Sequence, residues 1–339
     1  MPSPTPTHPA TGSPVPAVLQ RGYGGTEVLE LGERPLPVVG AGDVLVEVHA
    51  AAIDRGTWHL MTGTPTMVRL ALGLRRPRTQ VPGRDLAGVV VAVGHAVDGF
   101  AVGDRVHGTA DGSLTTHALT TPDRLAHVPD GCALDEAAAV PVSGLTAYQA
   151  LVEVAEVIAG QRVLVTGASG GVGTFAVQLA ATLGAAVTAS ARPDAHDRLR
   201  ALGATHVLDR TTGDPYLSAD ADSFDVVVDL AGRPPLRRLR RVLRRGGTAV
   251  IVGGEGGTTT VGGMSRQLRA VAVSPLVPER LAVLVSKERG DHLARLDEWW
   301  AAGRMHPVID STFGLDEVPA AMDRLTSGDV FGKVVVHLR

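Results

Sequence analysis

The segment from Gln161 to Ala180 joins a strand, a glycine-rich turn and a helix start with no intervening residues, and it constrains the fold more than any other feature. The run VLVT at 163–166 is apolar and mostly β-branched, which is typical of a parallel strand buried on both faces. A helix that begins near Val172 offers unpaired N–H groups and a dipole that favours an anion. Four glycines of the turn leave room for phosphate oxygens to approach: Gly167, Gly170, Gly171 and Gly173.

A glycine-rich turn alone predicts a dinucleotide site only weakly, because many tight loops share this pattern. Here, however, strand-like segments recur after the turn, separated by helix-like stretches, at 186–189, 224–230 and 248–253. This alternation predicts an α/β fold, a Rossmann domain with a doubly wound parallel sheet, over residues 137–280. We therefore interpret the turn as part of a dinucleotide-binding site.

The first third of the chain has a different organisation. Short strand-like pieces, broken by Gly, Pro and Asp, predict a small antiparallel and partly open barrel over residues 16–136; the clearest pieces are 44–48, 88–93 and 105–108. The end of the chain predicts helices at 288–303 and 316–327 and a strand at 333–338, but no core of its own. We expect residues 281–339 to pack on the barrel, so that the Rossmann domain is inserted within one other domain.

Composition and charge narrow the function. A length of 339 residues with 44% apolar composition is sufficient for two cores, and a net charge of −3 gives no reason to expect a nucleic acid or membrane partner. The single cysteine, Cys132, excludes an intramolecular disulfide and any cysteine-rich metal site. The first 15 residues are rich in Pro, Ser and Thr and have no signal-peptide pattern, so we expect a disordered tail on a cytoplasmic protein. The arginine-rich run 237–245 carries leucines at helical spacing and predicts a solvated helix face.

The order of motifs from about Ala17 to Arg339 resembles one family, the medium-chain dehydrogenase/reductases, in their zinc-independent quinone oxidoreductase branch. The resemblance implies a chaperonin-10-like catalytic domain and a Rossmann domain with the active site between them. The matching motifs are AGDVLVEVHAAAIDRGTWHLMTG (41–63), VPGRDLAGVVVAVG (81–94), AAAVPVSGLTAYQAL (137–151), VLVTGASGGVG (163–173), LRALGATHVLD (199–209), FDVVVDLAGR (224–233), RRVLRRGGTAVIVGG (240–254) and FGKVVV (331–336).

The positions of the three catalytic zinc ligands in zinc-dependent members of this superfamily correspond here to Asp54, Arg84 and Val142. Only Asp54 could bind a metal, whereas a catalytic zinc normally needs three His, Cys or carboxylate ligands. We therefore expect no metal. Without a Lewis acid a simple ketone is hard to polarise, which favours substrates that are already activated by conjugation.

The end of the second sheet strand favours NADP(H) over NAD(H). NAD enzymes usually carry an acidic residue there for the ribose hydroxyls, whereas this chain has Ser190 and Arg192, and no acid before Asp194. A 2′-phosphate would meet a hydroxyl and a guanidinium. Arg210, which follows the third strand, is a second candidate contact. The alternative for both arginines is a solvated surface role.

The resemblance implies four more cofactor contacts. Thr146 is expected beside the nicotinamide, Val252 and Gly253 under its ring through their backbone, and Lys333 at the pyrophosphate. The alternatives are a helix-cap role for Thr146 and a strand-edge charge for Lys333.

On the substrate side the resemblance places Asp54 and Trp58 in the catalytic cleft. Asp54 stands where relatives commonly have an amide, so it keeps a hydrogen-bond acceptor for a ribose hydroxyl of the cofactor and loses a donor. A carboxylate there could also transfer protons if burial raised its pKa. Trp58 would line the cleft, or pack in the core. Structural roles are favoured for four further residues: His59, His107, His117 and Asp85.

The leading hypothesis is an NADPH-dependent reductase that delivers hydride to an α,β-unsaturated ketone or a quinone, with a small molecule as its substrate. A cyclase, an isomerase or a nucleotide-binding regulatory protein on the same fold remains the alternative. The apolar stretch 270–276 is expected to be an edge strand, and such an edge predicts a homodimer.

Overall fold

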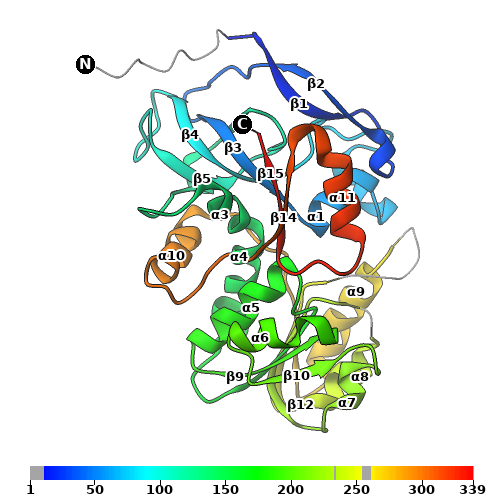
Figure 1. Cartoon of the computed structure of the whole chain (residues 1–339). Coiled ribbons are helices and arrows are strands. Elements are labelled where there is room, and N and C mark those ends of the chain that lie inside the picture. The colour runs from blue at the N-terminus through cyan, green and yellow to red at the C-terminus, as the bar shows by residue number, and fades with distance from the viewer. Residues whose placement is uncertain (1–10, 233, 254–260, 339) are drawn as a thin grey trace.

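The computed structural model describes residues 11–232, 234–253 and 261–338. The chain forms two lobes: one holds a mostly antiparallel β sheet, and the other a parallel sheet flanked by helices (Figure 1). Spatial order differs from chain order, because the last strands, drawn in red, return to the lobe that contains the first strands.

The parallel sheet has six strands in the order β10-β9-β8-β11-β12-β13. Counted from β8, this is the order 3-2-1-4-5-6 of dinucleotide-binding folds, and ligands bind where the order reverses, here between β8 and β11. The predicted glycine turn follows β8 directly. The strands are β8 (Arg162–Thr166), β9 (Ala186–Ala191), β10 (His206–Asp209), β11 (Phe224–Asp229), β12 (Leu243–Ile251) and β13 (Arg280–Val283).

Both faces of this sheet are buried, as the apolar strand sequences predict. Leu164 and Val227 pack in one hydrophobic cluster, whereas Val163 and Val165 pack in another, because successive side chains of a strand point to opposite faces. The flanking helices are α5 (Gly171–Thr182), α6 (His196–Ala201), α7 (Pro215–Ser218), α8 (Leu236–Val242) and α9 (Met264–Val273).

The other lobe is built around the long strand β3 (Val44–Ile53), in a seven-stranded sheet ordered β14-β15-β3-β4-β5-β7 with β6 also paired to β3. A separate hairpin of β1 (Pro14–Gln20) and β2 (Leu29–Pro35) adjoins it. The remaining strands are β4 (Asp85–Val93), β5 (Arg105–Thr109), β6 (His117–Thr120), β7 (Leu125–His127), β14 (Ile309–Gly314) and β15 (Lys333–His337). The remaining helices are α1 (Arg55–Thr62), α2 (Arg69–Leu72), α3 (Leu134–Ala139), α4 (Pro141–Tyr148), α10 (Gly290–Ala301) and α11 (Val318–Thr326). Of these, α4 packs on α5.

The C-terminal segment completes this second sheet. Strand β15 pairs antiparallel with β3, with Val335 opposite Ala52, and parallel with β14. In the sequence, the segment that forms the parallel sheet is therefore inserted between two segments of one β domain. The fold is the predicted α/β combination of a Rossmann sheet and a partly open barrel.

Three sequence predictions about segments are wrong. The stretch 270–276, expected to be an edge strand, is the end of α9 followed by a 3-10 turn, Ser274–Leu276; a short apolar run does not distinguish strand from helix by periodicity. The edge strand is instead β13, which belongs to the parallel sheet, so a domain boundary at 280/281 cuts through a strand. The arginine-rich run is not one helix, because α8 ends at Val242 and 243–251 is β12.

The N-terminal prediction is corrected at one point. Pro14 and Val15, assigned to a disordered tail, belong to β1, and Val15 is buried. Residues 1–10 lie outside the described part of the chain. Among the described residues, no helix is both long enough and apolar enough to cross a membrane.

Candidate functional site

The glycine turn is shaped by close backbone contacts. Gly167 has a φ of +68°, a conformation that side chains disfavour. A Cβ on Gly173 would lie 2.3 Å from the Gly167 carbonyl oxygen, so the helix start packs against the turn. A Cβ on Gly170, the residue that precedes α5, would meet nothing nearer than 3.5 Å. The first turn of α5, which includes Gly171 and Val172 and has unpaired N–H groups, therefore adjoins space at Gly170 that an anion can enter.

At Gly171 the space that a Cβ would take is already filled by neighbouring side chains. A Cβ there would lie 2.7 Å from Lys333 Cδ and 3.0 Å from Ser143 Oγ. Ser143 Oγ is buried and has no hydrogen-bond partner among the described residues. A hydroxyl without a partner beside the amino end of α5 fits a polar ligand at this place.

Three charged side chains from distant parts of the chain meet beside this turn. Lys333 Nζ lies 2.6 Å from Asp85 Oδ2 and 3.7 Å from Asp54 Oδ2. Asp54 caps α1 by accepting the Thr57 N–H at Oδ1, and Asp85 accepts the Val142 N–H at 2.7 Å. The side chains of Lys333 and Asp85 are 1% and 0% exposed and that of Asp54 is 13% exposed, so Asp54 is the least buried of the three, although its Oδ2 is itself buried.

This cluster holds one cation between two carboxylates. Burial raises the pKa of Asp85 to about 6, with the negative charge of Asp54 acting in the same direction, although Lys333 and the Val142 amide oppose the rise. Burial alone would lower the pKa of Lys333, but Asp85 and Asp54 outweigh it and hold that pKa above its ordinary value. Both shifts mean that the cluster binds protons more readily than isolated groups would.

Lys333 therefore has partners that the sequence did not reveal. The resemblance placed it at the cofactor pyrophosphate, and its stem does pack against Gly171 at the start of α5, but its ammonium group lies between Asp85 and Asp54. The amide contact of Asp85 agrees with the structural role expected for that residue. Its ion pair with Lys333 was not foreseen, because 248 residues separate the two.

The carboxyl end of β9 holds the residues expected at a 2′-phosphate. Ser190 is buried and pairs in register with Thr166 at the end of β8. The Arg192 guanidinium extends from the next turn and forms an ion pair at 3.1 Å with Asp194, whose side chain is well exposed. Arg210 donates a hydrogen bond to the Gly328 carbonyl at 3.3 Å, which ties it to the other lobe. A 2′-phosphate would thus compete with Asp194 for Arg192.

Thr146, Val252 and Gly253 lie on elements that border the same sheet edge. The Thr146 hydroxyl donates to the Val142 carbonyl within α4 at 2.7 Å, which leaves its lone pairs as acceptors. Val252 and Gly253 both donate their N–H to the Asp229 carbonyl at 3.1 Å. A Cβ on Gly253 would lie 1.9 Å from the Leu230 carbonyl oxygen, so the backbones after β11 and β12 touch.

A buried network that the sequence analysis missed fixes these strand ends. Asp229 accepts hydrogen bonds from Thr166 and Tyr216 at 3.0 and 2.8 Å, and Arg266 of α9 approaches its other oxygen at 2.5 Å. Burial, with the charge of Asp229, raises the pKa of Tyr216 well above its ordinary range, so the phenol stays a donor. A carboxylate at the end of the buried run FDVVVD was the available signal.

The three residues at the positions that correspond to zinc ligands make other interactions in this structure. Arg84 is paired with Glu288, which also accepts from Thr109 at 2.9 Å, while Val142 offers only its amide to Asp85. Among the residues that the structure describes, no three His, Cys, Asp or Glu side chains lie together as metal ligands would. The role of Glu288, like that of Asp229, was not predicted.

Trp58 packs against the hydrophobic core of the β lobe, and His107 and His117 are buried. Trp58 is half-buried on α1, with the Arg55 guanidinium 4.7 Å from its ring centre. His59 contacts the Thr64 carbonyl at 2.9 Å, and His107 is buried between Asp297 and the Ala137 carbonyl, at 2.9 and 3.1 Å. His117 is buried on β6. The contacts of His59 and His107 agree with the structural roles expected for these two histidines.

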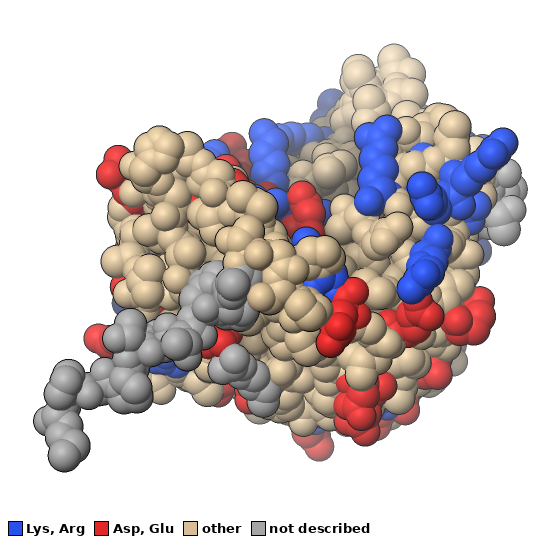
Figure 2. Space-filling view, turned by 90° about the horizontal axis from the view of Figure 1, so that it is seen from above, with Lys and Arg blue, Asp and Glu red and all other residues tan. Residues whose placement is uncertain are grey.

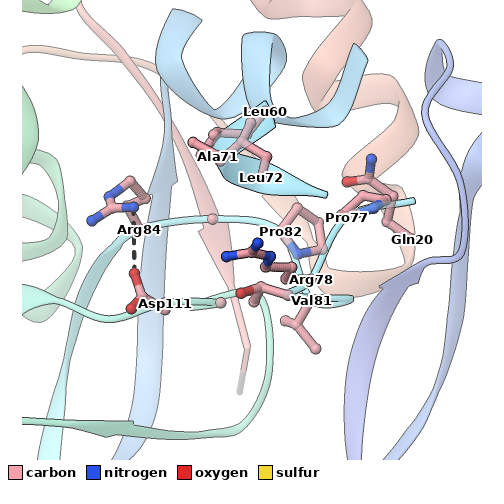
Figure 3. A pocket seen from close by; sticks show the side chains of 13 residues that line it. Gln20, Leu60, Ala71, Leu72, Pro77, Arg78, Val81, Pro82, Arg84 and Asp111 are labelled. Atoms are coloured by element: carbon pink, nitrogen blue, oxygen red, sulfur yellow. Dashed lines mark ion pairs between the residues drawn. The ribbon is translucent and has the colours of Figure 1, made fainter. Parts of the chain in front are cut away.

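A cavity of about 220 Å³ lies next to Arg84 (Figure 3). Leu60 of α1 and Leu72 of α2 form its apolar side, and Arg78, Arg84 and Asp111 bring charge to it. A larger hollow of about 590 Å³ lies at the amino ends of β8, β9 and β11. Ligands of such sheets bind at the carboxyl ends, which argues against the larger hollow, whereas the smaller cavity is lined by residues of the β lobe and remains a substrate candidate.

Comparisons with known proteins agree with this geometry. A family model described as alcohol dehydrogenase GroES-like domain matches residues 40–181, and one described as zinc-binding dehydrogenase matches residues 202–336. The chain is 31% identical over 333 residues to the chloroplastic quinone-oxidoreductase QR1 of Triphysaria versicolor, covering 95% of this chain and 98% of that protein. It is 32% identical over 334 residues to 2-methylene-furan-3-one reductase of Solanum lycopersicum, covering 93% and 77%. The structure of the quinone oxidoreductase from Coxiella burnetii superposes with a TM-score of 0.83 at 27% identity, covering 96% and 100%.

Proposed function

The chain belongs to the medium-chain dehydrogenase/reductase superfamily, among its quinone oxidoreductase-like oxidoreductases, and from this premise we propose that it is a zinc-independent, NADPH-dependent reductase of α,β-unsaturated ketones or quinones. The observation that carries the proposal is the state of the three ligand positions. Arg84 forms an ion pair with Glu288, and the Val142 side chain has no atom that could bind a metal. Asp54 is the single residue of the three whose side chain could act as a metal ligand. Without a Lewis acid at these three positions, an acceptor already polarised by conjugation is favoured. The names of the two relatives, a quinone oxidoreductase and a furanone reductase, fit such acceptors.

The residues fit a nicotinamide dinucleotide at the carboxyl edge of the parallel sheet. The start of α5 has open space at Gly170, and the nearby Ser143 hydroxyl has no hydrogen-bond partner within the described ranges, which fits a phosphate site. Ser190 and Arg192 would hold a 2′-phosphate, with Arg210 as a further cation, which is why NADPH is proposed over NADH. The bound cofactor supplies a hydride. Thr146 and the backbone of Val252 and Gly253 would position its nicotinamide end.

The proton for the second half of the reaction has a source within the site. Hydride addition to the β-carbon moves the double-bond electrons onto the carbonyl oxygen, and the α-carbon of the resulting enolate then takes a proton. Asp54 is the least buried of the three side chains, and Lys333 Nζ lies 3.7 Å from its Oδ2. We assign Asp54 as the group through which this proton reaches the substrate, with Trp58 as a wall of the cleft.

A spectrophotometric assay tests the proposal. NADPH oxidation is measured with a panel of enones and quinones, before and after treatment with a chelator. We expect saturable oxidation that the chelator leaves unchanged, with a saturated ketone or a hydroquinone as product. Tight NADPH binding without oxidation across the panel would favour the alternative, a cyclase, an isomerase or a nucleotide-binding regulator. Loss of activity on chelation, restored by zinc, would overturn zinc independence.

We also propose a homodimer, now through β13. This strand pairs only with β12 within the described part of the chain, and a free strand edge tends to pair with its copy. Leu276 and Val285, which flank β13, are 83% and 80% exposed. Light scattering at micromolar concentration is expected to give twice the chain mass, and a monomer mass would contradict the proposal.

A further inference from the structure

The cavity beside Arg84 has two unlike sides. Its apolar side consists of Leu60 on α1, together with Ala71 and Leu72 on α2, and Figure 3 shows these side chains side by side. Prolines and Val81 of the segment that leads into β4 continue this wall. Such a surface suits the hydrocarbon part of a ligand, since burial of apolar area is favourable and needs no partner.

Arg78 supplies a free positive charge to the same cavity. In Figure 3 its guanidinium points toward the middle of the lining residues. No ion pair or side-chain hydrogen bond of Arg78 occurs among the residues that the structure describes; only its backbone N–H is bonded, to the Leu72 carbonyl. The other guanidinium in the lining, that of Arg84, is already paired with Glu288 and lies 3.4 Å from Asp111. Arg78 is therefore the cation left for a ligand.

The electrostatic surroundings favour an anion at this place. Arg75 and Arg76, which precede Arg78, are also exposed and likewise lack charged partners within the described ranges. Asp111 is the one carboxylate in the lining, and it is shared between Arg84 and Arg124, each at 3.4 Å. Figure 2 shows that Lys and Arg gather on one part of the face seen from above, apart from most Asp and Glu.

Two lining residues connect the cavity through the chain to the cluster of Asp54, Asp85 and Lys333, although none of these three lines it. Arg84 directly precedes Asp85, and Leu60 lies on α1, the helix that Asp54 caps. A ligand in the cavity would thus extend from Arg78 toward Asp54. With about 220 Å³, the space is smaller than the roughly 300–1,000 Å³ of pockets for drug-sized ligands, so the ligand is small.

We propose that the substrate is a small amphipathic acid: an enone whose apolar part packs beneath α1 and α2 and whose carboxylate is bound by Arg78. This inference rests on the proposed reductase function and narrows its substrate class. A guanidinium binds a carboxylate through two parallel N–H···O contacts, which fixes the orientation of the ligand as well as its position. That orientation would present the double bond at the end of the cavity nearest Asp54.

Two matched compounds test the proposal. One is an enone whose chain ends in a carboxylate two methylene groups from the double bond, and the other is its methyl ester. For the wild type we expect kcat/KM to be about tenfold higher for the acid. Arg78→Gln should lower kcat/KM for the acid about tenfold and leave the ester within about twofold. Arg75→Gln is the control, since Arg75 is exposed in the same segment but does not line the cavity.

A binding measurement separates this inference from the function on which it rests. The saturated acid, which accepts no hydride, is titrated by calorimetry into wild type, Arg78→Gln and Arg75→Gln. We expect about tenfold weaker binding only for Arg78→Gln, and a decrease for the wild type at high salt. Equal acid-to-ester ratios in wild type and Arg78→Gln, or equal acid binding, would overturn the proposal. Acid binding through Arg78 without reduction of either enone would instead overturn the reductase function alone.

Discussion

The cofactor side and the substrate side of the proposed site are built in different ways. On the cofactor side, one continuous stretch supplies strand, turn and helix start, and its shape follows from backbone contacts at Gly167 and Gly173. On the substrate side, Asp54, Asp85 and Lys333 come from three segments and meet only in the folded chain. The first side is stabilised by local geometry, whereas the second depends on a charge balance. The two should therefore respond differently to substitution.

Removal of the cation should have the largest effect. Lys333→Met leaves Asp85 and Asp54 facing each other in a buried place, and breaking a buried ion pair costs about 3–5 kcal/mol. We expect a loss of about 3 kcal/mol in the free energy of unfolding at neutral pH, because Asp85 can take up a proton and limit the penalty. Urea denaturation measures it. Lys287→Met is the control, since the Lys287 side chain is exposed; equal stabilities of the two variants would mean that the cluster contributes nothing.

The pH dependence of stability tests the same charge balance without removing the lysine. The pKa of Asp85 is about 6 in the folded protein, above its ordinary 3.8, so the folded state holds the proton over this window while the unfolded state releases it. Stability from this group is complete below about pH 4 and falls as pH rises through 6, by up to about 3 kcal/mol. We expect wild type to lose stability over this window relative to Asp85→Asn. Parallel pH profiles for the two proteins would contradict the shift.

On the cofactor side, alanine substitutions at two glycines of the turn should have different effects on stability and on cofactor binding. Gly173→Ala forces a Cβ to within 2.3 Å of backbone atoms that cannot swing aside, and we expect a loss of about 1–3 kcal/mol in unfolding free energy. Gly170→Ala has space and an ordinary φ of −78°, so stability should stay within about 0.5 kcal/mol. NADPH affinity should nevertheless fall for Gly170→Ala, because its Cβ enters the proposed phosphate space. Unchanged affinity with unchanged stability would move the phosphate away from Gly170.

The contrast also explains what the sequence could predict. The strands β8, β9 and β11, the turn and the insertion of the parallel sheet follow from local patterns, because apolar runs and glycines act within a few residues. The stretch 270–276 was misassigned because its apolar residues suit a helix as well as a strand, and the true edge, β13, is only four residues long. Local patterns therefore predict that an element is present, but in a short segment they do not predict whether it is a helix or a strand.

Side-chain partners far apart in sequence were beyond such patterns. Arg84 pairs with Glu288, which lies 204 residues away, and nothing local to either residue indicates the pair. The network of Asp229, Tyr216 and Arg266 was missed for the same reason, although a carboxylate that ends a buried strand does indicate that some partner exists. Side-chain pairs between residues far apart in sequence can be identified only once the fold is known.

The smallest effect concerns cofactor choice, where local sequence and local structure agree in part. Arg192 follows β9 as expected, but it is already paired with Asp194 at 3.1 Å, and its side chain is 28% exposed. A 2′-phosphate must displace this carboxylate, so we expect Arg192→Ala to weaken NADPH binding only about tenfold, at the low end for a charge-assisted contact. NADH lacks the phosphate, and its affinity should barely change. Fluorescence titration of both cofactors gives the ratio, with Arg210→Ala as the comparison. An unchanged NADPH-to-NADH ratio in Arg192→Ala, with a reduced ratio in Arg210→Ala, would place the phosphate nearer Gly328, where Arg210 contacts the other lobe.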